Sequence, residues 1–80
     1  MKVRILAFGI AREILGNSSI SFPMHEGARV KELIFSLKEK YPRLKQLSTF
    51  KIALNNHFAE AHETISADDE IAVIPPVSGG

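Results

Sequence analysis

The C-terminus is the part of this chain whose residue types point most directly to chemistry. The chain ends in Pro75-Pro76-Val77-Ser78-Gly79-Gly80. Gly79 and Gly80 have no Cβ atoms, so this end can enter a narrow channel and adopt backbone angles that are closed to other residues. The two prolines stiffen the exit from the domain, and six extended residues span about 20 Å. The composition therefore predicts a tail that reaches into the active site of another protein.

The group at the end of such a tail is the α-carboxylate of Gly80. A free carboxylate is a poor electrophile because its charge repels nucleophiles and its leaving oxide is very basic. Adenylation by ATP removes both obstacles, and attack on the acyl-adenylate by a sulfur donor would leave a thiocarboxylate. The chain has no cysteine, so sulfur could be carried only on such a group. The alternative is that a terminal Gly-Gly is simply a flexible end, and the tail alone does not decide between the two.

Composition narrows the other possibilities. The 80 residues are enough for one small domain with one core, and 45% hydrophobic with 24% charged residues is typical of a globular protein. The absence of cysteine excludes disulfides, thiolate metal sites and iron-sulfur clusters. A net charge of +1 favours neither nucleic acid nor acidic membranes, and no apolar run approaches the roughly 20 residues of a membrane-spanning helix. We expect a cytoplasmic protein whose partners are proteins.

The remaining polar clusters do not predict a second site. Scattered spacing argues against a metal site at the three histidines, His25, His57 and His62. The basic residues near the end of the predicted helix complement its dipole, and these are Lys38, Lys40, Arg43 and Lys45. Gly9 and Gly16 are isolated and make no phosphate-binding loop. We therefore expect that this chain binds no cofactor and that any ATP is used by a partner enzyme.

Hydrophobic periodicity predicts the elements that must position the tail. Period-two alternation predicts strands at 2–8, 19–23, 51–54, 57–59 and 70–74. Apolar residues at steps of three and four predict one long helix over 28–41, ended by Pro42, and about one helical turn is expected at 11–15. The order fits an α+β fold, a ubiquitin-like β-grasp with a mixed five-stranded sheet packed on one main helix. We expect this domain at 1–76 and a flexible tail at 77–80.

Three local features complete these expectations. The helix should begin near Glu26-Gly27 without a side-chain cap, so we expect fraying there. Asn55-Asn56 predicts a tight turn with positive φ, and Asp68-Asp69 predicts another turn.

Apolar residues also occur on strand faces that we expect to be exposed to solvent. The first strand carries Phe8 on the same face as Arg4, and the last strand carries Ile74 on its outward face. If these strands are neighbours, Phe8 and Ile74 join Phe58 in an apolar patch beside the tail, a plausible docking surface. The alternative is that Phe8 or Phe58 belongs to the core.

Three segments of the chain together resemble a known family, the molybdopterin synthase small subunit. They are Arg12-Glu13-Ile14-Leu15-Gly16 after the first strand, the turn at Asp69-Glu70, and the end from Ile74 to Gly80. Gly-Gly is shared by all ubiquitin-like carriers, but Pro-Pro-Val-Ser-Gly-Gly after the last strand is characteristic of this group. The sequence departs from the family pattern at Arg29, Asn56 and Asp68, which leaves the local cap and turn geometry open and leaves the tail intact.

The resemblance implies a sulfur carrier that is not catalytic alone. Gly80 would be adenylated by an ubiquitin-activating-like enzyme with ATP, and a sulfur donor protein would then convert it to a thiocarboxylate. In the large subunit's active site the tail would give its sulfur to cyclic pyranopterin monophosphate, building the dithiolene of molybdopterin. The implied assembly is a heterotetramer around a large-subunit dimer. The partner-binding positions that carry over are Phe8, Phe58, Ile74, Pro75, Pro76, Val77, Ser78 and Gly79.

Three other functions remain open at this point. A carrier for thiazole synthesis would use the same terminal chemistry, but usually has a shorter chain and no Pro-Pro exit. A protein modifier would end in an isopeptide bond between Gly80 and a lysine, and conjugates in cells would reveal it. A plain interaction module would keep its activity when the glycines are trimmed.

Overall fold

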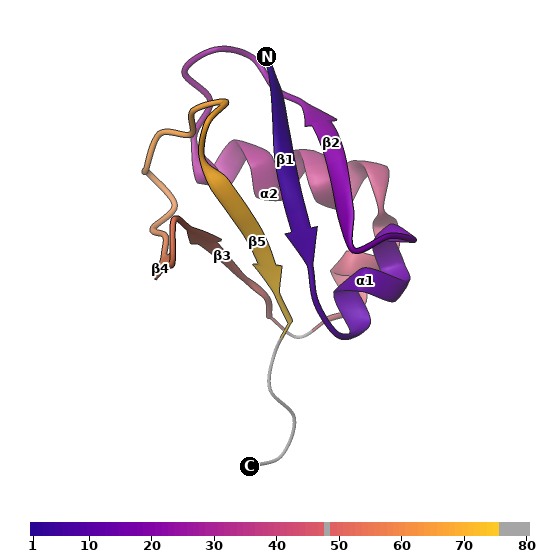
Figure 1. The fold of residues 1–80 in the computed structure, drawn as a ribbon. Helices are drawn as coiled ribbons and strands as arrows, with labels where there is room; N and C mark the ends of the chain where they lie inside the picture. Colours follow the sequence, from indigo (N-terminus) through magenta and orange to yellow (C-terminus); the bar gives the residue numbers. More distant parts are fainter. Residues whose placement is uncertain (48, 76–80) are drawn as a thin grey trace.

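The computed structural model describes residues 1–47 and 49–75. Its elements, in chain order, are β1 (Lys2–Ala7), α1 (Ile10–Leu15), β2 (Ser19–Pro23), α2 (Val30–Lys40), the 3₁₀ helix η1 (Pro42–Gln46), β3 (Lys51–Leu54), β4 (His57–Phe58) and β5 (Glu70–Ile74). The strands form one sheet in the order β2-β1-β5-β3-β4, with β1 and β5 parallel and the other pairs antiparallel (Figure 1). The expected α+β β-grasp, with a mixed five-stranded sheet and one main helix, is confirmed.

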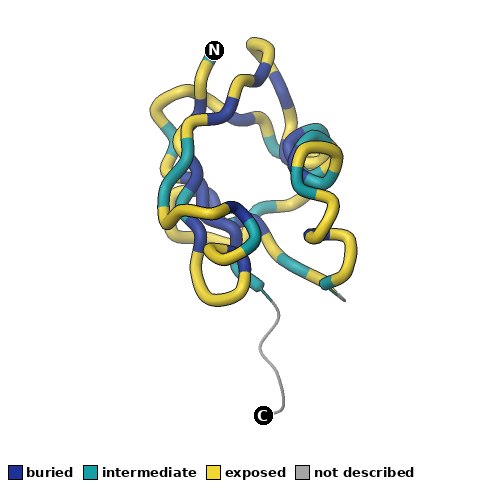
Figure 2. The backbone as a smooth tube through the Cα atoms, turned by 90° about the vertical axis from the view of Figure 1, so that its right-hand side faces the viewer, coloured by how far each residue is buried: buried dark blue, intermediate teal, exposed yellow. Residues whose placement is uncertain are grey.

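The core lies between the sheet and α2. On β1 the residues Val3, Ile5 and Ala7 are buried and alternate with more exposed residues, as the period-two pattern predicts. The register places Ile5 beside Ile71 of β5, and Ile71 beside Leu54 of β3, so buried side chains form a row across the sheet. The helix contributes Val30, Leu33 and Leu37 to the same cluster. Figure 2 shows buried positions on the strands and on the helix that lies across from them.

The start of α2 differs from the expectation and has a tertiary cause. The helix begins at Val30, and its N-cap residue, Arg29, makes no side-chain capping bond. Instead the Val30 amide donates to the Glu63 carbonyl at 2.9 Å and the Lys31 amide donates to the Ala61 carbonyl at 3.0 Å. These two carbonyls satisfy amides that a helix end otherwise leaves unpaired. We therefore no longer expect this helix end to fray, because a loop that is distant in the sequence supplies the missing cap.

The end of α2 leads into an element that the periodicity did not predict. Tyr41 leaves helical geometry immediately before Pro42, as expected for the residue before a proline. The chain then makes the 3₁₀ turn η1, whose Leu44 is fully buried. Leu44 therefore adds to the core beside the helix.

The turn at Asn55-Asn56 has the predicted positive φ values, 49° and 71°. The Asn55 amide side chain donates to Asp69 Oδ1 at 2.9 Å, and Asn55 Oδ1 accepts from the Glu70 amide at 2.9 Å. Asp69 Oδ2 in turn accepts from the Ser66 amide at 2.7 Å. The Asn55 side chain thus ties the β3–β4 turn to the turn that precedes β5.

We expect Asn55→Gly to lower the free energy of unfolding by about 1 kcal/mol, because it removes two side-chain hydrogen bonds and keeps a residue that accepts positive φ. Asn56→Gly is the matched control, since Asn56 also has positive φ and its side chain bonds to no described residue. Denaturant unfolding of the two variants measures the difference. Equal losses of stability would show that the turn, and not the link to Asp69, is responsible.

Candidate functional site: the docking face and the exit of the tail

The outward face of the sheet, turned away from α2, carries a continuous row of apolar side chains. Leu6 of β1 pairs with Ala72 of β5, Ala72 pairs with Ala53 of β3, and Ala53 pairs with Phe58 of β4. Residues paired in this way share one face of a sheet. Phe58 at the end of the row is 62% exposed. The structure therefore rejects the alternative in which Phe58 is a core residue.

A second group of apolar residues lies where β5 ends. Ile74 is half-buried and pairs with Lys51 of β3. The Lys51 ammonium lies 4.9 Å from the centre of the Phe58 ring, so its stem lies between the two apolar side chains. Phe8 follows β1 and is 50% exposed. Phe58 and Ile74 thus lie on one face, and Phe8 lines a groove together with Leu6 of that face. The role of these three residues in binding a partner stays a prediction.

The tail itself lies outside the described residues. The predicted reactive residue, Gly80, and the predicted partner-binding residues Pro76, Val77, Ser78 and Gly79 belong to this segment. Pro75 is described and half-buried, directly after β5. β5 is the middle strand of the sheet, bonded to β1 on one side and β3 on the other. Pro75 therefore lies at the end of the central strand of the sheet.

Sequence reasoning did not single out two residues near the start of the tail, Ile10 and Gly9. Ile10, the first residue of α1, is 39% exposed although it is large and apolar. The second residue is Gly9, which lies between Phe8 and Ile10 in the chain and has φ 55°. Ile10 could have been noticed in the sequence, because a large apolar residue stands there directly before the short apolar stripe of α1. A further exposed phenylalanine, Phe35, lies on α2 and is 67% exposed, but α2 covers the opposite face of the sheet.

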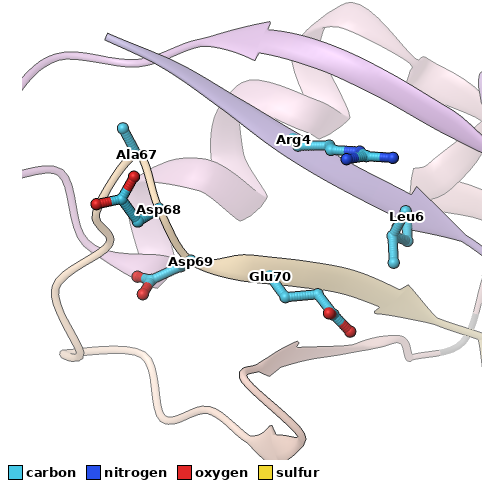
Figure 3. Close-up of a pocket in the computed structure, with 6 residues that line it drawn as sticks. All are labelled: Arg4, Leu6, Ala67, Asp68, Asp69 and Glu70. Atoms are coloured by element: carbon cyan, nitrogen blue, oxygen red, sulfur yellow. The ribbon is translucent and has the colours of Figure 1, made fainter.

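At its other end the outward face is charged. A groove there is lined by Arg4, Leu6, Ala67, Asp68, Asp69 and Glu70 (Figure 3). Arg4 and Glu70 are register partners on adjacent strands, and Asp69 is committed to the turn described above. These acidic residues therefore act in turn formation and as a polar margin of the apolar row. Nothing in their arrangement resembles a pair of catalytic carboxylates.

The histidines are engaged with carboxylates on the surface. His57 Nε2 lies 3.0 Å from Glu63 Oε1, His62 Nδ1 lies 3.6 Å from Glu60 Oε2, and His25 pairs with Glu32. The hydrogen bond to Glu32 raises the pKa of His25 above its ordinary value, with smaller support from the Glu26 carbonyl and the Glu32 charge. The Glu60 amide, followed by His57, lowers the pKa of Glu63.

The described residues contain neither a group of side chains suited to a metal ion nor a helix that could cross a membrane. Within 1–47 and 49–75, no three potential metal-ligating side chains cluster together. The helices of this part of the chain are also too short and too polar to span a bilayer.

The fold and the site define a class: a ubiquitin-like β-grasp protein with an exposed apolar face beside a C-terminal Gly-Gly tail. Residues 5–80 match the ThiS family, and the chain therefore belongs to this family. A molybdopterin synthase sulfur carrier subunit of Arabidopsis thaliana is 31% identical over the whole of this chain and 84% of its own length.

Two solved structures extend the comparison. A chain of a protein-protein complex of subunits 1 and 2 of molybdopterin-converting factor from Helicobacter pylori matches with a TM-score of 0.68, 30% identity and full coverage of both chains. The small archaeal modifier protein 1 of Methanosarcina acetivorans matches with a TM-score of 0.74 and 30% identity, covering 99% of this chain and 96% of its own. Both similarities extend over the domain and the tail sequence together.

Proposed function

We propose that this chain is the sulfur carrier subunit of a molybdopterin synthase. The observation that carries the proposal is the place of β5: the middle strand runs directly into Pro75 and the Gly-Gly tail, with exposed Phe8 and Phe58 on the face beside it. A carrier needs both parts, because one surface must hold the partner while the narrow end enters its active site. The full-length similarity to a plant protein named as such a subunit supports the same function.

The proposed chemistry takes place at the Gly80 carboxylate. One carboxylate oxygen attacks the α-phosphorus of ATP, pyrophosphate leaves, and an acyl-adenylate forms. A sulfide-level sulfur then attacks the acyl carbon, AMP leaves with the oxygen, and the product is a thiocarboxylate. In the second protein the thiocarboxylate sulfur attacks a carbon of cyclic pyranopterin monophosphate, and the new carbon–sulfur bond replaces a carbon–oxygen bond at that carbon, whose oxygen leaves with the electron pair. Water then cleaves the acyl–sulfur bond. Sulfur stays on the substrate, as the dithiolene requires, and the Gly80 carboxylate is regenerated.

The proposal assigns the nucleotide and the catalysis to partners. The chain offers a tail and a docking face, and the adenylation is the work of an ubiquitin-activating-like enzyme that binds ATP. A sulfur donor protein supplies the sulfur. The large synthase subunit supplies the active site, in a heterotetramer with two carriers on a central dimer. The complex of subunits 1 and 2 in the Helicobacter pylori structure supports a large-subunit partner of this kind.

Intact-mass measurement tests the proposed function directly. The full chain is incubated with ATP, the activating enzyme and a sulfur donor, and the expected product has one oxygen replaced by sulfur. Fragmentation places the exchange at Gly80. Omission of ATP is the control, because the carboxylate is then not activated and no exchange is expected. A mass that stays unchanged in the complete mixture contradicts the proposal.

One specific observation favours a second candidate, a protein modifier. The similarity to a small archaeal modifier protein at 30% identity is as high as that to the Helicobacter pylori subunit. The same acyl-adenylate would then be attacked by a lysine amine instead of sulfur, and AMP would leave as before. Isopeptide-linked conjugates of Gly80 in cells would support this function, and a thiocarboxylate without conjugates supports the carrier. A carrier for thiazole synthesis would show the thiocarboxylate but no transfer to the pyranopterin.

A further inference from the structure

The turn between β1 and α1 depends on a glycine. Gly9 has φ 55° and ψ −132°, in a region that residues with a Cβ rarely adopt. The Ala11 amide donates to the Phe8 carbonyl at 3.0 Å, so Gly9 is the second residue of a tight turn, the place where a type II′ turn requires positive φ. The Arg12 amide donates to the Gly9 carbonyl at 3.1 Å and continues the chain into α1.

The same glycine meets the root of the tail. β1 and β5 are parallel with Ala7 beside Val73, so two residues further on Gly9 comes beside Pro75. A Cβ built on Gly9 would lie 3.4 Å from Pro75 Cγ. A Cβ on Gly9 would therefore already be in van der Waals contact with the proline ring, and a longer side chain directed toward the ring would compete with it for space.

Two other glycines show which property of Gly9 comes from its backbone angle alone and which comes from the contact with Pro75. Gly16 and Gly27 also have positive φ, 82° and 80°, but a Cβ on either one would meet nothing within 4 Å. The positive φ of their turns is therefore sufficient to explain why glycine occupies these two positions. Gly9 differs, because it has both a positive φ and a neighbour 66 positions later in the chain, at the place where the tail begins.

We propose that Gly9 is a positioning residue for sulfur transfer: its missing side chain lets Pro75 lie close against the β1–α1 turn, which sets where and in which direction the tail begins. This inference rests on the proposed carrier function. Proline holds its own φ near one value, so one of the two backbone torsions at Pro75 cannot adjust when its ring is displaced. A misplacement of about 1 Å at a reacting group can lower a rate about 100-fold.

The test compares leucine substitutions at two glycines. Gly9→Leu and Gly27→Leu both strain a backbone with positive φ, but only Gly9→Leu places its added side chain next to Pro75, where we expect it to displace the ring. The thiocarboxylate of each full-length variant is made by sulfide cleavage of a C-terminal thioester, which bypasses the activating enzyme. Single-turnover transfer to cyclic pyranopterin monophosphate is then measured with saturating large subunit, together with the Kd of the carrier for the large subunit and its thermal unfolding.

We expect Gly9→Leu to transfer sulfur at least about 10-fold more slowly than Gly27→Leu, with similar Kd and Tm values for the two variants. Equal transfer rates, or a difference found wholly in Kd, overturn the positioning role. If Gly9→Leu does not fold, the pair Gly9→Ser and Gly27→Ser replaces it, since Oγ also extends beyond Cβ. A wild-type chain that transfers no sulfur overturns the proposed function itself, whereas normal wild-type transfer with a normal Gly9 variant overturns this inference alone.

Discussion

Deletion of Gly80 is expected to abolish sulfur delivery while the domain stays folded. The deletion moves the terminal carboxylate onto Gly79 and shortens the reach by about 3.5 Å. A reacting atom displaced by that distance leaves the attack geometry, for which even about 1 Å matters. Gly79→Leu should have the same effect for another reason, because a side chain blocks a channel made for bare backbone. Single-turnover transfer to the pyranopterin measures both variants.

Thermal unfolding provides the control for these tail variants. The buried core consists of residues of the domain, from Val3 to Val73, so both variants should unfold at the wild-type temperature. Full activity after deletion of Gly80 would contradict the proposed chemistry. A large fall in Tm would instead show that the tail contributes to folding, which would disagree with a tail that serves another protein's active site.

Truncation of the exposed aromatic residues is expected to weaken docking on the large subunit. Phe58→Ala and Phe8→Ala remove rings that are 62% and 50% exposed in the free chain and would become buried in the complex. Aromatic anchors of an interface contribute about 2 kcal/mol or more each, so we expect Kd to rise at least about 30-fold. Titration calorimetry with the purified large subunit measures this change.

Phe35→Ala supplies a matched control for the docking variants. Phe35 is 67% exposed, as much as Phe58, but it lies on α2, which covers the other face of the sheet. Its truncation removes the same apolar area from water in the free chain and should leave Kd unchanged. An equal weakening by Phe35→Ala, or no weakening by Phe8→Ala and Phe58→Ala, would place the docking surface elsewhere.

Local pattern was enough to predict most of the strands. β2 and β5 have the predicted bounds, because alternation and the following turn or proline both mark their ends. The Asn55-Asn56 turn was also predicted, since asparagine tolerates positive φ. The period of their strands indicated exposed positions for Phe8 and Phe58 but left a place in the core open as the alternative. The strand bounds and the turn depend on residues that are close together in the sequence, whereas the pairing of β1 with β5 does not.

Features that depend on distant residues could not be predicted. The cap of α2 comes from the carbonyls of Ala61 and Glu63, and no residue near Val30 in the sequence indicates that these carbonyls will be close to it. The 3₁₀ turn η1 is too short to show a period, although it buries Leu44. The contact between Gly9 and Pro75 joins two ends of the chain that only the parallel pairing of β1 with β5 brings together. In the sequence Gly9 is an isolated glycine.

The central place of β5 has a consequence for the durability of the carrier. A carrier is recharged and emptied many times, and each cycle pulls its end into one protein and out of another. β5 is hydrogen-bonded on both flanks, to β1 and to β3, whereas the outer strands β2 and β4 are each bonded on one flank and can fray separately. Pro75 therefore follows a strand that is held on both sides, and we expect the amides of that strand to exchange with solvent more slowly than those of β2 and β4.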